Sequence, residues 1–348
     1  GTNQEFTDLA AFAEVTWNIS ENWQITGGVR FFDQKLTGTS GIPLPYASRT
    51  LEFYYYGTAT DDFLFGGINP TEYEVDDQIF KFNTSYNLSE DMMLFATFAE
   101  GFRPGGANQL PEIDPFGNDN SEILDFEPDV VDSYELGLKG TMQDRFNYTA
   151  TVFYMDWQDF QATLASPFGI AYVDNVPGAE SRGLELELSG YISDRFDFTL
   201  GYFYVDTEIS EDFDFVAGDP ETEITAGTSL PGIPENEVFA AANYRIPLAD
   251  SSLVFHIDAS YRDETKSNFR DIPSYPAANY AEFDDFMLWN ASLTWDLDQY
   301  SVGLFGENLG NERAESLVTT ADFYGQRDQA RGVIRPRTIG LRLRYRWE

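Results

Sequence analysis

Residues 130–157 read VVDSYELGLKGTMQDRFNYTATVFYMDW, and this stretch decides the fold class. In both of its halves apolar or aromatic residues alternate with mostly polar ones, as Tyr134, Leu136 and Leu138 do in the first half. Successive side chains of a strand point to opposite faces, so each half has one apolar and one mostly polar face. A short polar turn at residues 142–145 joins the halves into a hairpin. Each strand has roughly ten residues, which is what a tilted β-strand needs to cross a bilayer.

The same alternation recurs along the whole chain. We count thirteen strands, joined in strict alternation by six short turns and six long loops. The long loops are expected near residues 35–74, 103–129, 158–182, 206–235, 263–283 and 308–334. Outer-membrane barrels have short periplasmic turns and longer extracellular loops, with apolar side chains outward and polar ones inward. The sequence therefore predicts an all-β chain, a transmembrane antiparallel β-barrel whose last strand runs inward.

The strand count carries a further expectation. Bacterial single-chain barrels have even numbers of strands, and thirteen is odd. An open sheet in lipid leaves backbone groups unpaired along both edges, and each such group costs several kcal/mol. We therefore expect additional N-terminal strands to complete the barrel.

Composition excludes several classes of function. The formal net charge is -38, from 59 acidic and 21 basic residues, so general electrostatic attraction to nucleic acid is excluded. The chain has no cysteine and one histidine, His256, so neither a disulfide framework nor a multi-histidine metal centre can form within it. No metal site and no cofactor is predicted. Aromatic residues make up 16% of the chain, and membrane barrels concentrate such residues in interfacial girdles.

Five segments, in order, resemble those of TonB-dependent outer-membrane receptors. They are FAEGFRPGG at residues 98–106, SYELGLK at 133–139, AESRGLELE within residues 175–188, ENLGNE at 307–312 and RPRTIGLRLRYRW at 335–347. The family has a barrel of 22 strands around an N-terminal plug. The resemblance therefore implies that residues 1–348 are the C-terminal portion of such a barrel, with about 13 strands of a probable 22, and that the plug, the TonB box and the first strands are absent from this sequence.

The resemblance also implies a function. Such a protein lies in the outer membrane of a Gram-negative bacterium, in contact with lipid and lipopolysaccharide. It captures a scarce solute, most often a ferric siderophore, and imports it with energy delivered by the TonB–ExbB–ExbD complex through the plug. A passive porin-type channel, or an importer of an oligosaccharide or a cobalamin, are the alternatives. A soluble β-sandwich or propeller is the remaining structural alternative.

Candidate ligand-binding residues lie in the expected loops. Tyr54, Tyr55 and Tyr56 offer rings for stacking, although such aromatics more often pack loops together. Arg103, Arg327 and Arg331 could bind an anionic ferric chelate or a carboxylate, and ion pairs with nearby acids are the competing interpretation.

Other polar residues belong to the expected strands. We expect Glu185, Glu187, Arg342, Arg344 and Arg346 to face the lumen, because an arginine on the lipid face costs about 2–4 kcal/mol at mid-membrane. The arginines are expected to pair with lumen carboxylates such as these two glutamates. His256 lies near Asp258, but no nucleophile motif accompanies this pair. The chain is therefore not predicted to be an enzyme.

Overall fold

The computed structural model describes residues 3–40, 69–108, 119, 121–165, 171–216, 218–271, 280–322 and 327–347. Thirteen strands form one antiparallel sheet, in which each strand pairs with the next of the thirteen along the chain. They are β1 (Asn3–Asn18), β2 (Trp23–Ser40), β3 (Asn69–Ser89), β4 (Met92–Arg103), β7 (Asp129–Met142), β8 (Phe146–Ala165), β9 (Ala171–Ser193), β10 (Phe196–Ile209), β13 (Asn236–Leu248), β14 (Ser251–Arg262), β17 (Phe286–Leu297), β18 (Tyr300–Glu307) and β21 (Thr338–Tyr345). The predicted fold class and strand number are confirmed.

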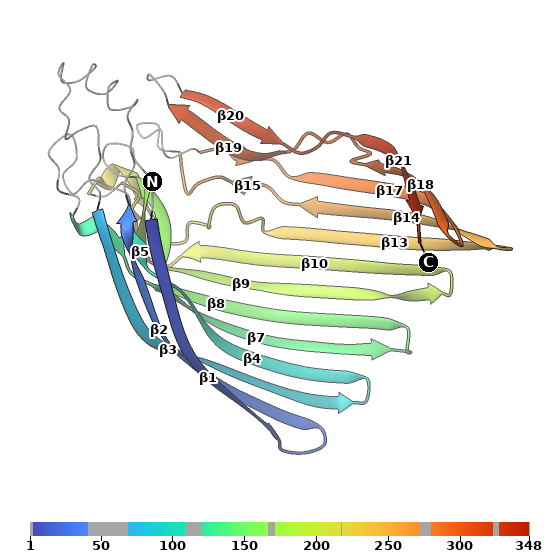
Figure 1. Cartoon of the computed structure of the whole chain (residues 1–348), viewed down its shortest axis with the longest axis horizontal. Coiled ribbons are helices and arrows are strands. Elements are labelled where there is room, and N and C mark those ends of the chain that lie inside the picture. Colours follow the sequence, from blue (N-terminus) through green and yellow to red (C-terminus); the bar gives the residue numbers. More distant parts are fainter. Residues whose placement is uncertain are drawn as a thin grey trace.

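The sheet is a curved trough rather than a closed barrel, with β1 and β21 at its two free edges (Figure 1). Short turns lie at one end of the strands and the long connections at the other (Figure 1). We call these the turn end and the loop end. β21 finishes at the turn end, as the alternation of short and long connections predicts.

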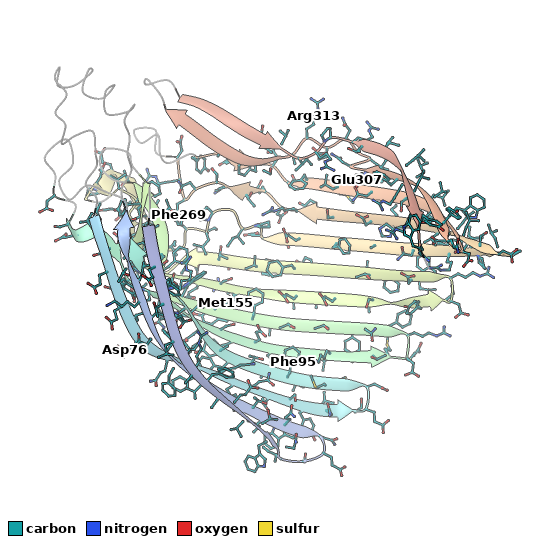
Figure 2. All side chains as sticks on the ribbon, viewed as in Figure 1. Asp76, Phe95, Met155, Phe269, Glu307 and Arg313 are labelled. Carbon is teal, nitrogen blue, oxygen red and sulfur yellow. The ribbon has the colours of Figure 1, made fainter. Side chains whose placement is uncertain are left out.

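The strand register keeps one face apolar across the sheet. Leu186 of β9 pairs with Ala150 of β8 and with Tyr202 of β10, and Tyr202 pairs with Val238 of β13. A slip of one residue would move every side chain to the other face, so this continuity fixes the register. Large side chains on this apolar face are exposed, Leu186 by 39%, and no second sheet or helix covers them in the described chain (Figure 2).

Aromatic side chains border the apolar face at both ends. At the turn end, Tyr300 and Tyr345 have ring centroids 4.8 Å apart, and Trp347 lies 4.7 Å beyond Tyr345. Toward the loop end, Tyr134 lies 5.0 Å from Phe98 and 6.3 Å from Tyr154. Two aromatic borders around an apolar band are the arrangement of a membrane-spanning barrel wall. No helix in the described residues is long and apolar enough to span a membrane.

Several expected loop boundaries were wrong, because strands continue beyond the apolar band. β2 extends to Ser40 and β3 begins at Asn69, within the loop expected at residues 35–74. Likewise β8 runs to Ala165 and β9 begins at Ala171. Beyond the band both faces meet water or other protein, so the alternation fades while the backbone ladder continues. Other expected loop segments form small two-stranded sheets: β5 (Gly106–Ala107) with β6 (Asp125–Phe126), β11 (Phe213–Asp214) with β12 (Glu223–Ile224), β15 (Thr265–Lys266) with β16 (Glu282–Phe283), and β19 (Glu315–Asp322) with β20 (Arg327–Val333).

The buried core lies at the loop end. It includes Leu164 and Val176 from the extended β8 and β9, Ile209 at the end of β10, and Phe215 and Val216 from the following loop, each at most 5% exposed. Outside the bilayer these strand extensions are in water, so they need a core of the soluble kind, whereas the spanning part needs none. Phe269, at the loop end, belongs to this core (Figure 2).

Candidate ligand site at the loop end

A cavity of about 780 Å³ borders the loop-end core. We call it the loop-end cavity. Its lining is mainly apolar and includes six aromatic side chains, namely Trp157, Phe160, Phe215, Phe269, Phe283 and Phe286. Three cationic side chains also line it, Arg103, Arg262 and Lys266. An apolar cavity of this size with a few convergent polar groups is typical of a small-molecule site.

Arg103, the last residue of β4, is fixed by a buried carboxylate. Its Nε donates to the two carboxylate oxygens of Asp129 at 3.0 and 2.9 Å, and its Nη2 donates to Oδ2 of the same group. Asp129, at the start of β7, is fully buried, whereas the Arg103 side chain is 44% exposed. Asp129 also accepts the backbone N–H of Gln161 at 3.0 Å. The arginine is therefore anchored on one side and open on the other.

Two aromatic rings pack against the Arg103 guanidinium. Its Cζ lies 4.7 Å from the ring centroid of Trp157 and 5.4 Å from that of Phe160. These rings belong to β8 and meet edge to face at 4.9 Å. Between them Asp159 has a φ of 51°, a left-handed conformation that turns the chain and brings both rings to the same side.

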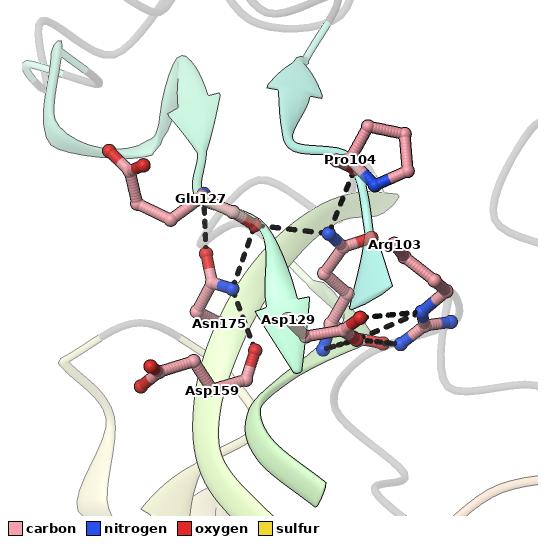
Figure 3. Close-up of polar contacts among 7 residues, drawn as sticks. Arg103, Pro104, Glu127, Asp129, Asp159 and Asn175 are labelled. Carbon is pink, nitrogen blue, oxygen red and sulfur yellow. Dashed lines mark hydrogen bonds and ion pairs between the residues drawn. The ribbon is translucent and has the colours of Figure 1, made fainter. Parts of the chain in front are cut away.

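Side-chain amides hold the backbone around this arginine (Figure 3). Gln161 Nε2 donates to the carbonyl oxygens of Pro104 at 3.1 Å and Glu127 at 3.0 Å. Asn175 Nδ2 donates to the carbonyl oxygens of Glu127 at 3.0 Å and Asp159 at 2.7 Å. These bonds connect β8 and β9 to the segments on either side of the loop between β4 and β7. The backbone around Arg103 is thus held in place by side-chain hydrogen bonds from β8 and β9.

The lining of the cavity also includes a second arginine. Arg262, at the end of β14, lies with its Nε 3.4 Å from Glu237 Oε1 and donates from Nη2 to the Gly232 carbonyl at 3.1 Å. The neighbouring Asp263 accepts hydrogen bonds from the Tyr261 hydroxyl and from Asn236, both at 2.6 Å. These bonds, Tyr261 first, hold the pKa of Asp263 below its usual value.

The ligand residues expected from sequence have different outcomes. Arg103 lines the loop-end cavity, and its ion pair with Asp129 also forms. Tyr54, Tyr55 and Tyr56 lie outside the described residues. Arg327 begins β20, and its placement in a ligand site stays a prediction.

The strand residues expected to face the lumen share the polar face. Glu185 pairs with Phe203 of β10, which pairs with Glu237 of β13, and both Glu185 and Glu187 line a hollow of about 410 Å³. Within the described chain, Arg342, Arg344 and Arg346 form no ion pair with these two glutamates, and their pairing with other lumen carboxylates stays a prediction. Six strand spacings, about 29 Å, separate β9 from β21 along the sheet. Arg342 instead lies over the Phe305 ring, with its Cζ 5.1 Å from the centroid.

His256 is part of a hydrogen-bonded chain on the polar face. Its Nδ1 lies 2.7 Å from Asn243 Oδ1 and its Nε2 lies 3.1 Å from Asp258 Oδ1. Asn243 donates to Asp197 at 2.6 Å, and Asn290 donates to Asp258 at 2.7 Å. Both ring nitrogens of His256 are thus engaged by side chains of the polar face. Among the residues described, no group of three His, Cys, Asp or Glu side chains is placed to hold a metal ion.

Sequence reasoning missed most of the site. Asp129, Trp157, Phe160, Gln161 and Arg262 lie in strand ends that look like ordinary loop margins. Their common signal is weak: each lies just beyond the apolar alternation of its strand, on the polar face or after a turn. Only the pairing of β4 with β7 and of β7 with β8 brings the first four of them around Arg103.

Comparison with known proteins agrees with this architecture. Residues 1–309 match the family model described as TonB dependent receptor-like, beta-barrel. The chain therefore belongs to the TonB-dependent receptors, a family of receptors in the outer membrane of Gram-negative bacteria, and the resemblance inferred from its motifs is confirmed.

Individual relatives are more distant. The pesticin receptor of Yersinia enterocolitica is 27% identical over 183 residues, which cover 51% of this chain and 22% of the receptor. Among solved structures, the ferric yersiniabactin uptake receptor FyuA of Yersinia pestis superimposes with a TM-score of 0.73 at 17% identity, over 99% of this chain and 46% of that one. The siderophore receptor PiuA of Acinetobacter baumannii gives 0.71 at 16% identity, over 99% and 44%. The chain thus spans about half the length of these solved receptors, and its matched segment covers about a fifth of the pesticin receptor.

Proposed function

We propose that this chain forms part of the barrel wall and of the extracellular mouth of an energised outer-membrane receptor that imports a ferric siderophore. The observation that carries the proposal is the loop-end cavity, in which an anchored and half-exposed Arg103 lies among aromatic rings. Ferric siderophore complexes are commonly anionic, and a partly desolvated guanidinium binds anions well. The names of the relatives favour a siderophore over an oligosaccharide, a cobalamin or a passive porin function.

The loop end would face the outside and the turn end the periplasm. Further strands would complete the barrel along the free edges of β1 and β21, because unpaired strand edges are costly in lipid. The apolar face would contact lipid and, at the outer leaflet, lipopolysaccharide. Import would draw on the TonB–ExbB–ExbD complex through a plug domain of the full-length receptor.

Uptake of radioactive iron tests this proposal. The gene for the full-length receptor is deleted, and the strain is grown under iron limitation with one ferric siderophore at a time. We expect at least one siderophore whose uptake is lost on deletion, restored by the wild-type gene and abolished without TonB. Unchanged uptake of every siderophore, or uptake that persists without TonB, would contradict the proposal.

A further inference from the structure

An apolar groove of about 430 Å³ lies on the apolar face of the sheet, at the aromatic border near the loop end. Its lining includes four rings, Phe82, Phe98, Tyr134 and Tyr154, and the small side chain of Ala96. In the register Phe82 pairs with Phe98, Phe98 with Tyr134, and Tyr134 with Tyr154. The rings therefore form one continuous row across β3, β4, β7 and β8. A groove of this kind on a face that meets hydrocarbon fits an acyl chain.

A row of carboxylates borders this groove on the loop-end side. Glu100 pairs with Asp132, Asp132 with Asp156, Asp156 with Glu180, and Glu180 with Glu208. We call these five residues the carboxylate row. On β4, β7 and β8 the row lies two residues beyond the rings, so it shares their face. Two residues span about 7 Å along a strand and about 5 Å along the bilayer normal at a tilt near 40°. The carboxylate row therefore lies at the depth of lipid headgroups.

The described protein compensates only one end of the carboxylate row. Arg182 lies 2.7 Å from Asp206 and 3.6 Å from Glu208. Glu100 accepts the backbone N–H of Phe80 at 2.8 Å, but it and the three central members of the row form no ion pair with any residue that the structure describes. Like charges on directly opposite residues destabilise a sheet. A counter-charge from a bound partner would relieve this repulsion.

We infer that this surface binds a membrane lipid whose headgroup carries an ammonium group. The acyl chain lies in the groove, and the ammonium group pairs with Asp132 and Asp156, directly beyond Tyr134 and Tyr154. Charge complementarity identifies this occupant, because the row attracts a cationic headgroup and repels one that carries only phosphate. The groove accepts an acyl chain of any lipid, so selectivity comes from the row. The orientation proposed above places this lipid in the outer leaflet, and the imported cargo plays no part in the inference.

Lipid binding to the full-length receptor in detergent, measured by native mass spectrometry, tests the inference. The probes are lysyl-phosphatidylglycerol, phosphatidylethanolamine and phosphatidylglycerol with identical acyl chains. We expect lysyl-phosphatidylglycerol to bind at least about tenfold more tightly than phosphatidylglycerol, with phosphatidylethanolamine between them, because a charge-assisted contact contributes about a factor of ten or more.

Three variants assign the contacts. The double substitution Asp132→Asn with Asp156→Asn should reduce the preference for the ammonium lipid to about twofold or less. Glu185→Gln with Glu187→Gln is the matched control, because it removes as many carboxylates from the polar face and should keep the preference. Ala96→Phe fills the groove and should weaken all three lipids severalfold without changing their order. Heat-modifiable migration on gels checks that each variant folds.

A divalent cation that bridges the carboxylate row to a lipid phosphate is the competing occupant. In that case magnesium would raise the binding of phosphatidylglycerol to the level of lysyl-phosphatidylglycerol, and a chelator would remove the gain, which overturns the inference. Equal binding of the three lipids by the wild-type receptor overturns it without any variant. An unchanged preference after Asp132→Asn with Asp156→Asn, or an equal loss in the control, also overturns it. Iron uptake tests the proposed function separately, since none of these results depends on the cargo.

Discussion

Replacing Leu186 by arginine tests whether the apolar face of this sheet meets lipid. Leu186 lies on β9 between Ala150 and Tyr202 in the register, and 39% of its surface is exposed. A buried core residue would be covered by a second layer, whereas this one has none in the described chain. The substitution places a charge where hydrocarbon is expected.

The position of Leu186 in the membrane sets the magnitude. Apolar residues on this face of β9 run from Leu184 to Ile192, about 27 Å along the strand and about 21 Å across a bilayer at a tilt near 40°. Leu186 lies two residues from the midpoint, so about 5 Å from mid-membrane. An outward arginine costs about 2–4 kcal/mol at the midplane, and we expect about 2–3 kcal/mol here. That corresponds to a roughly 30- to 150-fold loss in the folding equilibrium.

The assay is folding of urea-denatured, full-length receptor into lipid vesicles, followed by heat-modifiable gel migration across a urea series. Ser189→Arg is the matched control: it lies three residues away on the polar face, beside Asn147 and Thr199. We expect the control to shift the folding free energy by less than about 0.5 kcal/mol. Equal effects of the two arginines would refute the assignment of the faces.

Three further predictions concern the loop end. Asp129→Asn should destabilise the Arg103 region by about 1–3 kcal/mol, because it removes the charge-assisted hydrogen bonds that hold a half-exposed arginine. Hydrogen exchange at residues 103–108 and 158–162 should become faster while the protein still inserts into membranes. Unchanged exchange at these residues would contradict the prediction. Asn308→Ala should lower local stability by about 2–4 kcal/mol, because the Asn308 side chain donates to the carbonyl oxygens of Glu312 at 2.8 Å and Arg335 at 3.0 Å and accepts from the Glu312 N–H at 2.8 Å. Asn308 also has a φ of 48°, which disfavours alanine, so Asn308→Gly should recover only the part of the loss that comes from backbone strain. Limited proteolysis of the β19–β20 hairpin measures both effects. Burial raises the pKa of Asp174, although a hydrogen bond from the Asn175 backbone N–H lowers it in part. The stability of the loop end should therefore fall as the pH rises from the pKa of the unfolded chain, about 3.9, through the raised pKa of the folded protein. Asp174→Asn should remove this pH dependence of stability, as measured by hydrogen exchange across the same pH range.

The sequence predicts the spanning part well because lipid imposes a simple rule. Leu184, Leu186 and Leu188 must alternate with polar residues whatever their neighbours do, since one face meets hydrocarbon and the other does not. The same rule located the short turns and hence the direction of the last strand. It fails where the bilayer ends, which is why the extensions of β8 and β9 were taken for loops.

The sequence by itself determined the strand order, the apolar face and the family, because each depends on local alternation or on short motifs. Arg103 was also predicted as a candidate, from its positive charge and its place in an expected loop. Only the tertiary structure showed that Asp129 is its buried partner and that Trp157, Phe160 and Arg262 line the same cavity. Together with Arg103, these residues come from four different strands. Their pairing across the sheet depends on register and loop path, which no local sequence pattern records.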